Sequence, residues 1–292
     1  VDEYIIDGVL GGGGFSIVYN AHRVSDSEQT VIIKEFMPKK LATRVNETEV
    51  ISLDPSAPEA YNKGRKLFFQ EASTLATLKH TNIVDVFNFF QANGTVYMVM
   101  EYQPGENLQH YLQGRRGGLS ETFLRTVFPP LLDGLELIHN NDLLHLDIKP
   151  GNVHIQRGGQ PLLLDFGAVY HLDDVGEKKA QVVTPGFSPV EQYYASGRVG
   201  PSTDVYAVGA TMRACIEGKP PPSAVERHAK DQLLPALEAF GGRYPREILE
   251  SIDWAMQLKP ENRPRSAAEL RDALLGRIPV PRQPWDTAGR EA

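Results

Sequence analysis

Hydrophobic and polar positions divide the chain into a first part typical of β-strands and a later part typical of helices. Short runs rich in β-branched and aromatic residues, bounded by glycine or polar turns, predict the strands. They are expected at Tyr4–Leu10, Val18–Arg23, Thr30–Phe36, Val84–Gln91 and Thr95–Glu101, with Asn93-Gly94 as a hairpin turn. Residues 37–66 are polar and irregular apart from a short strand at Val50–Leu53. Apolar residues at helical spacing then predict a helix over Leu67–Leu78.

After Gly105 the helical period dominates. The pattern predicts a helix over Leu119–Asn140, with Ser120 as N-cap, that Pro129-Pro130 should kink or split. Further helices are expected at Pro201–Glu217, Pro245–Leu258 and Ser266–Leu275. We therefore expect an α+β chain with a small β-rich lobe and a larger helical lobe, joined near Glu101–Gly105. Ligands favour the cleft between two such lobes.

Composition narrows the class of protein. The 292 residues are 41% hydrophobic and 23% charged, as in ordinary globular domains. Thirty Lys and Arg against 37 Asp and Glu give a net charge of −7, which disfavours nucleic acid as the main partner. A single cysteine, Cys215 in an apolar setting, excludes an intrachain disulfide and favours a buried thiol in a reducing, cytoplasmic compartment.

The termini and the hydropathy suggest a fragment. The chain starts at Val1 rather than Met, and its proline-rich end is typical of a linker, so we expect a catalytic piece of a longer protein. No apolar run approaches the ~20 residues that span a bilayer, so no membrane contact is expected within this fragment. An anchor could lie outside it.

A glycine-rich turn and a lysine on a predicted strand are the first candidate functional residues, because both could bind phosphates. Gly11 to Gly14 lie between two predicted strands, where glycines let backbone N–H groups approach phosphates. Alone, such a run is more often a flexible turn, and it fits neither a Walker A loop nor a Rossmann turn. Lys34, one strand later, could reach those phosphates or could snorkel to solvent at an edge. A buried lysine needs a partner, for which Glu71 is the best candidate and Glu59 and Glu35 are weaker ones.

The most specific signal comes from two loops. One reads His145-Leu146-Asp147-Ile148-Lys149-Pro150-Gly151-Asn152, and the other reads Asp165-Phe166-Gly167 after an apolar run. Asp147 could orient an attacking hydroxyl and accept its proton. Asn152 and Asp165 supply the hard oxygens that suit Mg²⁺, and Lys149 could neutralise a transferred anionic group. Charged loop residues that cluster by coincidence rarely show all of these spacings together.

With these motifs in order, the chain resembles the eukaryotic-type (Hanks-type) protein Ser/Thr kinase family over Tyr4 to Leu275, in a bacterial style. The resemblance implies the bilobal protein kinase fold. Its N-lobe would span 1–102 and its C-lobe 103–277, with a linker tail over 278–292.

The resemblance also implies roles for individual residues. The expected catalytic residues are Asp147, Lys149, Lys34, Glu71 and Thr184. Those expected to bind ATP are Leu10, Gly11, Gly13, Val18, Ile32, Lys34, Met100, Glu101, Gln103 and His154. Asn152 and Asp165 would hold Mg²⁺, with Mn²⁺ as the alternative metal.

Structural contacts are implied as well. Glu191 would pair with Arg263, Asp204 would anchor the catalytic loop, and Thr184 would contact Asp147 and Lys149. His139 and His145, which could suggest a metal site, are expected to pack and form hydrogen bonds instead.

Position 146 departs from the family. Leu146 stands where most members have the arginine that receives a phosphate from the activation loop, which makes this a non-RD sequence. The segment 168–183 also contains no Ser or Thr, only Tyr170 as a hydroxyl residue. Both features predict activity that does not depend on phosphate upstream of Thr184.

Three functions remain open at this stage. The first is a Ser/Thr kinase acting on protein substrates, with autophosphorylation as a further outcome. The second is a pseudokinase that serves as an ATP-binding regulatory or scaffold module. The third, ranked below these, is a small-molecule kinase, which typically lacks a segment like Thr184–Glu191. The sequence leaves the substrates and the oligomeric state open.

The adenine pocket should also differ from that of most members. Ile32 stands where an alanine usually lies over the adenine ring, and His154 stands where a leucine usually lies beneath it. We therefore expect less space above the ring and a more polar surface below it. Ile32→Ala should therefore change the affinities for nucleotide and for ATP-competitive inhibitors, measured by titration calorimetry. Unchanged affinities would contradict the expectation.

Overall fold

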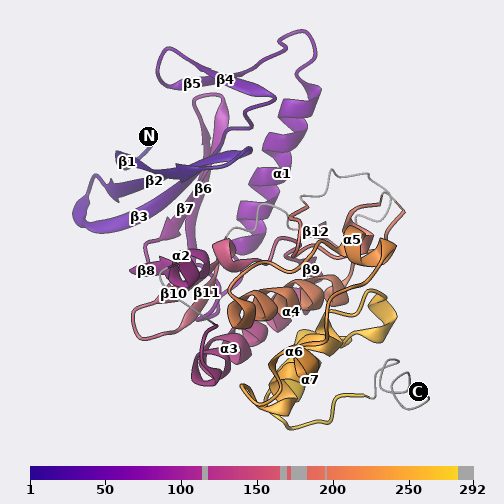
Figure 1. The fold of residues 1–292 in the computed structure, drawn as a ribbon. Helices are drawn as coiled ribbons and strands as arrows, with labels where there is room; N and C mark the ends of the chain where they lie inside the picture. Colours follow the sequence, from indigo (N-terminus) through magenta and orange to yellow (C-terminus); the bar gives the residue numbers. More distant parts are fainter. Residues whose placement is uncertain (114–117, 165–169, 172–182, 195, 282–292) are drawn as a thin grey trace. The chain divides into compact units, whose positions relative to one another are not determined.

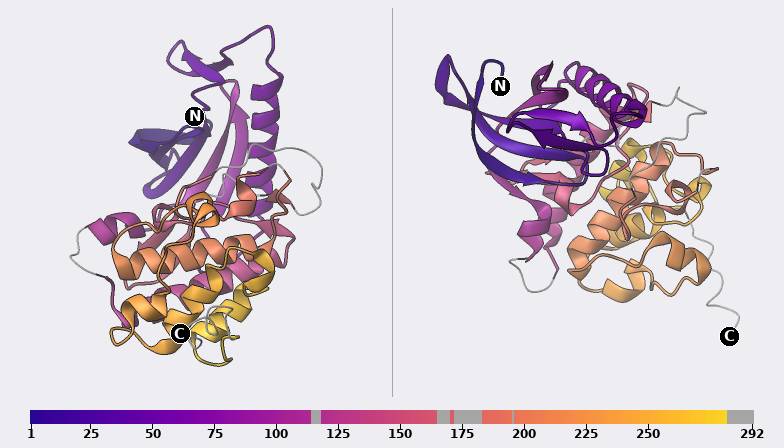
Figure 2. Two further views of the ribbon diagram at one scale, coloured as in Figure 1. Left: turned by 45° about the vertical axis from the view of Figure 1, so that its right-hand side comes forward. Right: turned by 90° about the horizontal axis from the view of Figure 1, so that it is seen from above.

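The computed structural model describes residues 1–113, 118–164, 170–171, 183–194 and 196–281. The chain divides into two compact units, Val1–Pro104 (unit 1) and Gly105–Ala292 (unit 2). Within the described residues, none of the helices combines the length and the hydropathy that a transmembrane helix requires. Figures 1 and 2 show the two units as ribbons.

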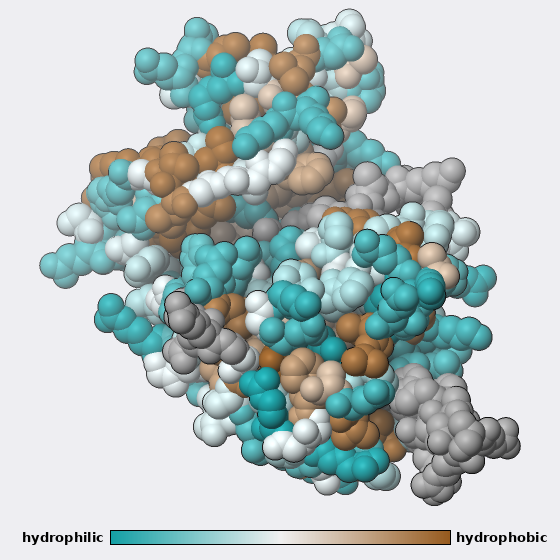
Figure 3. Space-filling view, viewed as in Figure 1, coloured by the Kyte–Doolittle hydropathy of each residue, from teal (hydrophilic) through white to brown (hydrophobic). Residues whose placement is uncertain are grey.

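Unit 1 is built on an antiparallel five-stranded sheet in the order β1-β2-β3-β7-β6 (Figure 1). The strands are β1 (Tyr4–Gly12), β2 (Ser16–Arg23), β3 (Asp26–Phe36), β6 (Val86–Ala92) and β7 (Thr95–Glu101). The predicted strands are thus confirmed. One hydrophobic cluster on this sheet comprises Tyr4, Ala21, Val31, Ile33, Tyr97 and Val99. The edge strand β1 exposes Ile5, Val9 and Leu10, and Figure 3 shows hydrophobic surface over this part of unit 1.

Helix α1 (Glu59–Leu75) packs against β6 and β7, as both views in Figure 2 show. It begins at Glu59 and ends at Leu75, so the predicted range Leu67–Leu78 was wrong at both ends. Of the residues before Leu67, only Tyr61 is buried. The first turns are therefore polar nearly all round and give no hydrophobic period, because the helix meets the sheet mainly through its second half.

The segment expected to be irregular contains a hairpin, β4 (Ala42–Val45) paired with β5 (Glu49–Ser52). Its turn places both Asn46 and Glu47 at positive φ, 49° and 64°. The loop between the paired residues Val45 and Glu49 is three residues long, and left-handed residues in such loops are usually signalled by Asn or Gly. Glutamate in the second position hides that signal, so the prediction of an irregular segment missed β4.

Unit 2 is organised around two long helices, α3 (Glu121–His139) and α4 (Pro201–Glu217). The Ser120 hydroxyl accepts a hydrogen bond from the Phe123 N–H at 3.2 Å, which confirms the predicted N-cap. Helix α3 continues through Pro129 and Pro130, so the proline pair does not split it. Buried residues on both sides of the pair, from Leu124 to Ile138, hold the helix together by packing.

Helix α4 is buried from Thr203 to Ile216, as expected for the central helix of a larger domain. Its Cys215 is fully buried, and burial raises the pKa of that thiol, which confirms the predicted inert environment. The other predicted helices correspond to α7 (Arg246–Ala255) and α8 (Ala267–Leu274).

Shorter elements complete unit 2. The first group is β8 (Gly105–Asn107), α2 (Leu108–Gln113), β9 (Leu143–Leu144), η1 (Pro150–Asn152), β10 (Val153–Gln156), β11 (Pro161–Leu163) and β12 (Tyr170–His171). The second group is η2 (Val190–Gln192), α5 (Ala224–Ala229), α6 (Ala236–Phe240) and η3 (Pro260–Asn262). Strands β8, β10 and β11 form a small sheet, and β9 pairs with β12. The loop between β9 and η1 carries two of the candidate catalytic residues, Asp147 and Lys149.

A buried ion pair braces unit 2. Arg263, just after η3, donates two hydrogen bonds to the Glu191 carboxylate of η2, at 2.7 and 3.1 Å, and confirms the predicted pair. The arginine also donates to the carbonyl oxygens of Gln257, Ser202 and Leu258. Because the side chains are only 0% and 6% exposed, neither charge has bulk water as an alternative partner.

Removing this cation should therefore destabilise the fold. Arg263→Met leaves Glu191 buried without its counter-charge, so we expect the free energy of unfolding to fall by about 3–5 kcal/mol. Urea denaturation measures the change. The matched control is Arg246→Met, which removes an exposed pair with Glu250 and should cost less than about 1 kcal/mol. An equally small loss in Arg263→Met would contradict the assignment.

Candidate active site

A fully buried carboxylate holds the loop that follows β9. Asp204, on the first turn of α4, accepts hydrogen bonds from the backbone N–H groups of His145 and Leu146 at 2.9 and 2.7 Å. His139, at the end of α3, contributes its Nε2 at 2.9 Å from the same carboxylate. The predicted anchoring role of Asp204 is confirmed, and both histidines form hydrogen bonds as expected.

These contacts decide the charge state of Asp204. Burial alone would raise its pKa, but the hydrogen bonds and the electrostatic interaction with His139 and His145 outweigh burial, so the pKa lies below the usual value. The carboxylate is therefore ionised at neutral pH. As an ion it can accept all three hydrogen bonds at once, which fixes the start of the loop.

Leu146 has an unusual backbone for its residue type. Its φ is +59°, in the left-handed region, which costs a leucine about 1–2 kcal/mol. Its N–H is held by Asp204, and its carbonyl oxygen accepts a hydrogen bond from Gln192 Nε2 at 2.9 Å. A hydrogen bond to a charged group contributes about 1.5–3 kcal/mol, enough to offset the strain. The side chain is buried, at 4% exposure.

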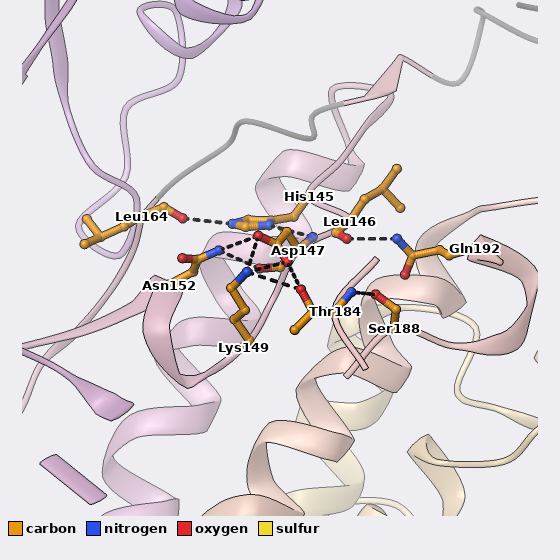
Figure 4. Close-up of polar contacts among 9 residues, drawn as sticks. All are labelled: His145, Leu146, Asp147, Lys149, Asn152, Leu164, Thr184, Ser188 and Gln192. Carbon is orange, nitrogen blue, oxygen red and sulfur yellow. Dashed lines mark hydrogen bonds and ion pairs between the residues drawn. The ribbon is translucent and has the colours of Figure 1, made fainter. Parts of the chain in front are cut away.

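The turn at Leu146 presents Asp147 to three polar partners (Figure 4). Lys149 Nζ lies 2.9 and 2.7 Å from the two oxygens of the Asp147 carboxylate. The Thr184 hydroxyl donates to Oδ1 of the same carboxylate at 2.8 Å and accepts from Lys149 at 3.2 Å. The predicted contacts of Thr184 are therefore confirmed. One hydroxyl oxygen thus sits between a carboxylate and an ammonium group.

Asn152 completes this cluster from η1. Its side-chain nitrogen donates to the main-chain oxygen of Asp147 at 2.8 Å and to Oδ2 at 2.9 Å. These two bonds settle the orientation of the amide, so that its oxygen is presented on the opposite side (Figure 4). A carbonyl oxygen is a ligand that Mg²⁺ accepts, so Asn152 fits the metal role proposed for it.

The other predicted metal ligand, Asp165, lies outside the described residues, but its neighbour Leu164 is tied to the same loop. The Leu164 N–H donates to the main-chain oxygen of Asn152 at 2.9 Å. Its carbonyl oxygen lies 3.1 Å from His145 Nε2. Among the described residues, no three His, Cys, Asp or Glu side chains form a metal-binding group. The second ligand role thus stays a prediction.

In unit 1, the strand register places four predicted nucleotide-binding residues on one face of the sheet. Val18 lies opposite Lys34, and Ile32 lies opposite Met100. Directly paired residues share a face, and so do residues two apart on one strand. Lys34 is buried, with its ammonium 5.6 Å from the centre of the Phe68 ring on α1. Glu71 is buried on the same helix, and its pairing with Lys34 stays a prediction.

The remaining predicted binding residues lie at the ends of strands. Leu10 and Gly11 lie in the last part of β1, which ends at Gly12, and Gly13 lies in the turn that follows. Glu101 ends β7, with Gln103 two residues beyond. In unit 2, His154 lies on the central strand β10 of its small sheet. The sharing of one nucleotide by all these residues also stays a prediction.

Two polar contacts of the site were missed from the sequence. Gln192 holds the carbonyl of Leu146, and Ser188 Oγ accepts from the Thr184 N–H at 2.9 Å. Gln192 and Ser188 lie close in sequence to Glu191, which was predicted from the sequence to be the partner of Arg263. This proximity was the signal that could have pointed to them. For His139 a hydrogen bond was expected, but its partner Asp204 was not predicted. In unit 1, Glu35 is bound by Arg44, a partner that was not considered from the sequence.

Comparisons with known proteins agree with this geometry. A model of the protein kinase domain matches residues 4–275. The serine/threonine-protein kinase PknA of Nostoc sp. is 31% identical over 96% of this chain and 48% of the relative. Serine/threonine-protein kinase C of Synechocystis sp. is 27% identical over 99% of this chain and 52% of its own length. The chain thus spans about half the length of these curated relatives.

A solved structure described as the apo form of PpkA-294 is also similar. It superimposes with a TM-score of 0.81 at 35% identity and covers 94% of this chain and 96% of that one. The predicted bilobal kinase architecture is confirmed by this likeness and by the family match. The chain belongs to the protein kinase domain family, in a group with bacterial serine/threonine-protein kinases.

Proposed function

We propose that this chain is the catalytic domain of a protein serine/threonine kinase, which transfers the γ-phosphoryl group of Mg·ATP to Ser and Thr hydroxyls of proteins. The observation that carries the proposal is the Thr184 hydroxyl. It donates to the Asp147 carboxylate at 2.8 Å and accepts from Lys149 at 3.2 Å. The Asp147 carboxylate and the Lys149 ammonium group thus bind one alcohol oxygen, that of Thr184.

The roles of the unit 2 residues follow from these contacts. Asp147 orients the substrate hydroxyl and accepts its proton as the oxygen attacks. Lys149 holds the carboxylate in place and offsets negative charge that develops on the transferred group. Thr184 would yield one of its hydrogen bonds to the substrate hydroxyl and line the position beside it.

Bound Mg²⁺, or Mn²⁺, would supply charge neutralisation at the phosphates. Asn152 would hold the metal through its side-chain oxygen, because its nitrogen is committed to Asp147. Asp165 would be the second ligand, as the residue that follows the tethered Leu164. In unit 1, Lys34 would hold the α- and β-phosphates, and the glycine-rich turn would cover them.

Position 146 supports a non-RD kinase. The Leu146 side chain is buried and cannot bind a phosphate, so the loop is held by Asp204 and Gln192 instead. A pseudokinase is the alternative function. The presence of Lys34, Asp147 and Asn152 disfavours it, since such proteins usually lack one of these groups. Cytoplasmic location and autophosphorylation belong to the proposal as well.

Asp147→Asn should lower the phosphotransfer rate by about 10²–10⁴-fold, because the amide cannot accept the proton. Transfer from γ-labelled ATP to the domain itself and to a serine-rich protein substrate measures the rate. The control Asp133→Asn removes a partly exposed carboxylate that pairs with Arg271 on α8, and should retain the rate. ATP binding without transfer in the unmodified protein would instead identify a pseudokinase.

Activity should survive removal of phosphate from the activation segment. After treatment with a phosphatase that is then removed, we expect the first turnovers to proceed at the untreated rate, because Leu146 offers no phosphate-binding cation. Mass spectrometry would confirm that Tyr170 carries no phosphate. Loss of activity that returns only when the segment upstream of Thr184 is phosphorylated would contradict this.

A further inference from the structure

A buried acid lies one residue beyond Lys34 and has no part in the proposed chemistry. Glu35 is 1% exposed, and its carboxylate accepts hydrogen bonds from Tyr19 at 2.7 Å and Tyr97 at 2.8 Å. Arg44 forms an ion pair with the same carboxylate. Three donors from β2, β4 and β7 therefore converge on one side chain of β3.

This cluster lies on the face of the sheet opposite to Lys34. Consecutive residues of a strand point to opposite faces, and Glu35 lies directly across from Tyr97. Ile33 and Tyr97 belong to the hydrophobic cluster of that face. The Glu35–Arg44 pair is therefore separated from the predicted phosphate-binding side by the thickness of the sheet.

The pair closes a short loop that contacts the glycine-rich turn. After β3, the Met37 N–H donates to the Phe15 oxygen, and the Lys39 N–H donates to the Gly14 oxygen, both at 2.9 Å. The chain then turns at Pro38, whose oxygen accepts from the N–H groups of Leu41 and Ala42 at 2.9 Å, and enters β4.

Arg44 brings the loop back to the strand it left. Besides pairing with Glu35, it donates to the Thr48 oxygen at 2.9 Å, across the turn of its own hairpin, and to the Tyr19 hydroxyl at 3.3 Å. The segment from Phe36 to Thr43 is thus fixed at both ends by one ion pair, in which Glu35 is buried and Arg44 is partly exposed. Its middle holds the tip of the glycine-rich turn by two backbone hydrogen bonds.

We propose that Arg44 and Glu35 are positioning residues for the glycine-rich turn, and that their ion pair fixes the loop 36–43 so that Met37 and Lys39 hold the Gly14–Phe15 tip. The effect on catalysis rests on the proposed kinase function, whereas the mechanical coupling does not. Glycine residues in the turn have little stiffness of their own, so an external brace determines where the tip lies.

The mechanical test is amide hydrogen exchange at Met37 and Lys39, the two donors to the tip. Arg44→Met should accelerate exchange at both amides by about tenfold or more, while central strand amides such as that of Val99 keep their rates. The double variant Glu35→Gln with Arg44→Met should do the same. Because it leaves no unpaired buried carboxylate, it keeps the test decisive if the single variant fails to fold.

Arg23→Met is the matched control, since Arg23 pairs with Glu3 on the exposed surface of the same sheet. It should leave the exchange rates of Met37 and Lys39 unchanged, and Arg44→Lys should restore part of their protection. Unchanged exchange at Met37 and Lys39 in the double variant overturns the proposal, whether or not the protein phosphorylates anything.

Kinetics tests the functional part. A displaced tip weakens the hold on nucleotide, so the KM for ATP should rise about three- to tenfold in the double variant with kcat nearly unchanged. A merely structural role would lower the active fraction, and thus the apparent kcat, without moving KM. Accelerated exchange with unchanged KM would retain the brace but refute its role in nucleotide binding.

Discussion

The loop between β9 and η1, which carries Asp147, depends on a single carboxylate that water does not reach. Asp204 is fully buried, ionised and bound by three donors, two of which are main-chain N–H groups of the loop itself. Such a group stabilises one backbone conformation only, because any other leaves a buried charge without partners. The left-handed turn at Leu146, and through it the direction of Asp147, follows from this constraint.

Unit 1 contains a comparable arrangement. Glu35 is nearly as buried as Asp204 and is likewise surrounded by donors from several elements. The two differ in what they hold. Asp204 binds the backbone of the catalytic loop directly, whereas Glu35 acts through Arg44 and the loop that this arginine closes. In both units, a buried carboxylate outside the proposed reacting centre holds a segment for which a catalytic or nucleotide-binding role is proposed.

The sequence predicted the parts that rest on local chemistry. Strands of β-branched residues, the Ser120 cap, the Glu191–Arg263 pair and the Thr184 contacts all appear in the structure. It failed where tertiary packing decides. The start of α1 is solvated and leaves no hydrophobic period, and α3 runs through two prolines because its flanks are buried. The β4–β5 turn uses Asn46-Glu47, which lacks the glycine that usually marks such a turn.

The missed contact between Glu35 and Arg44 has a physical reason. Glu35 follows Lys34 in an apolar strand, and the two were weighed as partners for each other. Alternation along a strand rules this out, because it sends their side chains to opposite faces. Once Glu35 is placed on the far face, its burial demands a cation from elsewhere in the chain, and Arg44 on β4 supplies it. The β4–β5 hairpin, which the sequence predicted as an irregular segment, therefore supplies the cation for a buried carboxylate next to the candidate nucleotide-binding lysine.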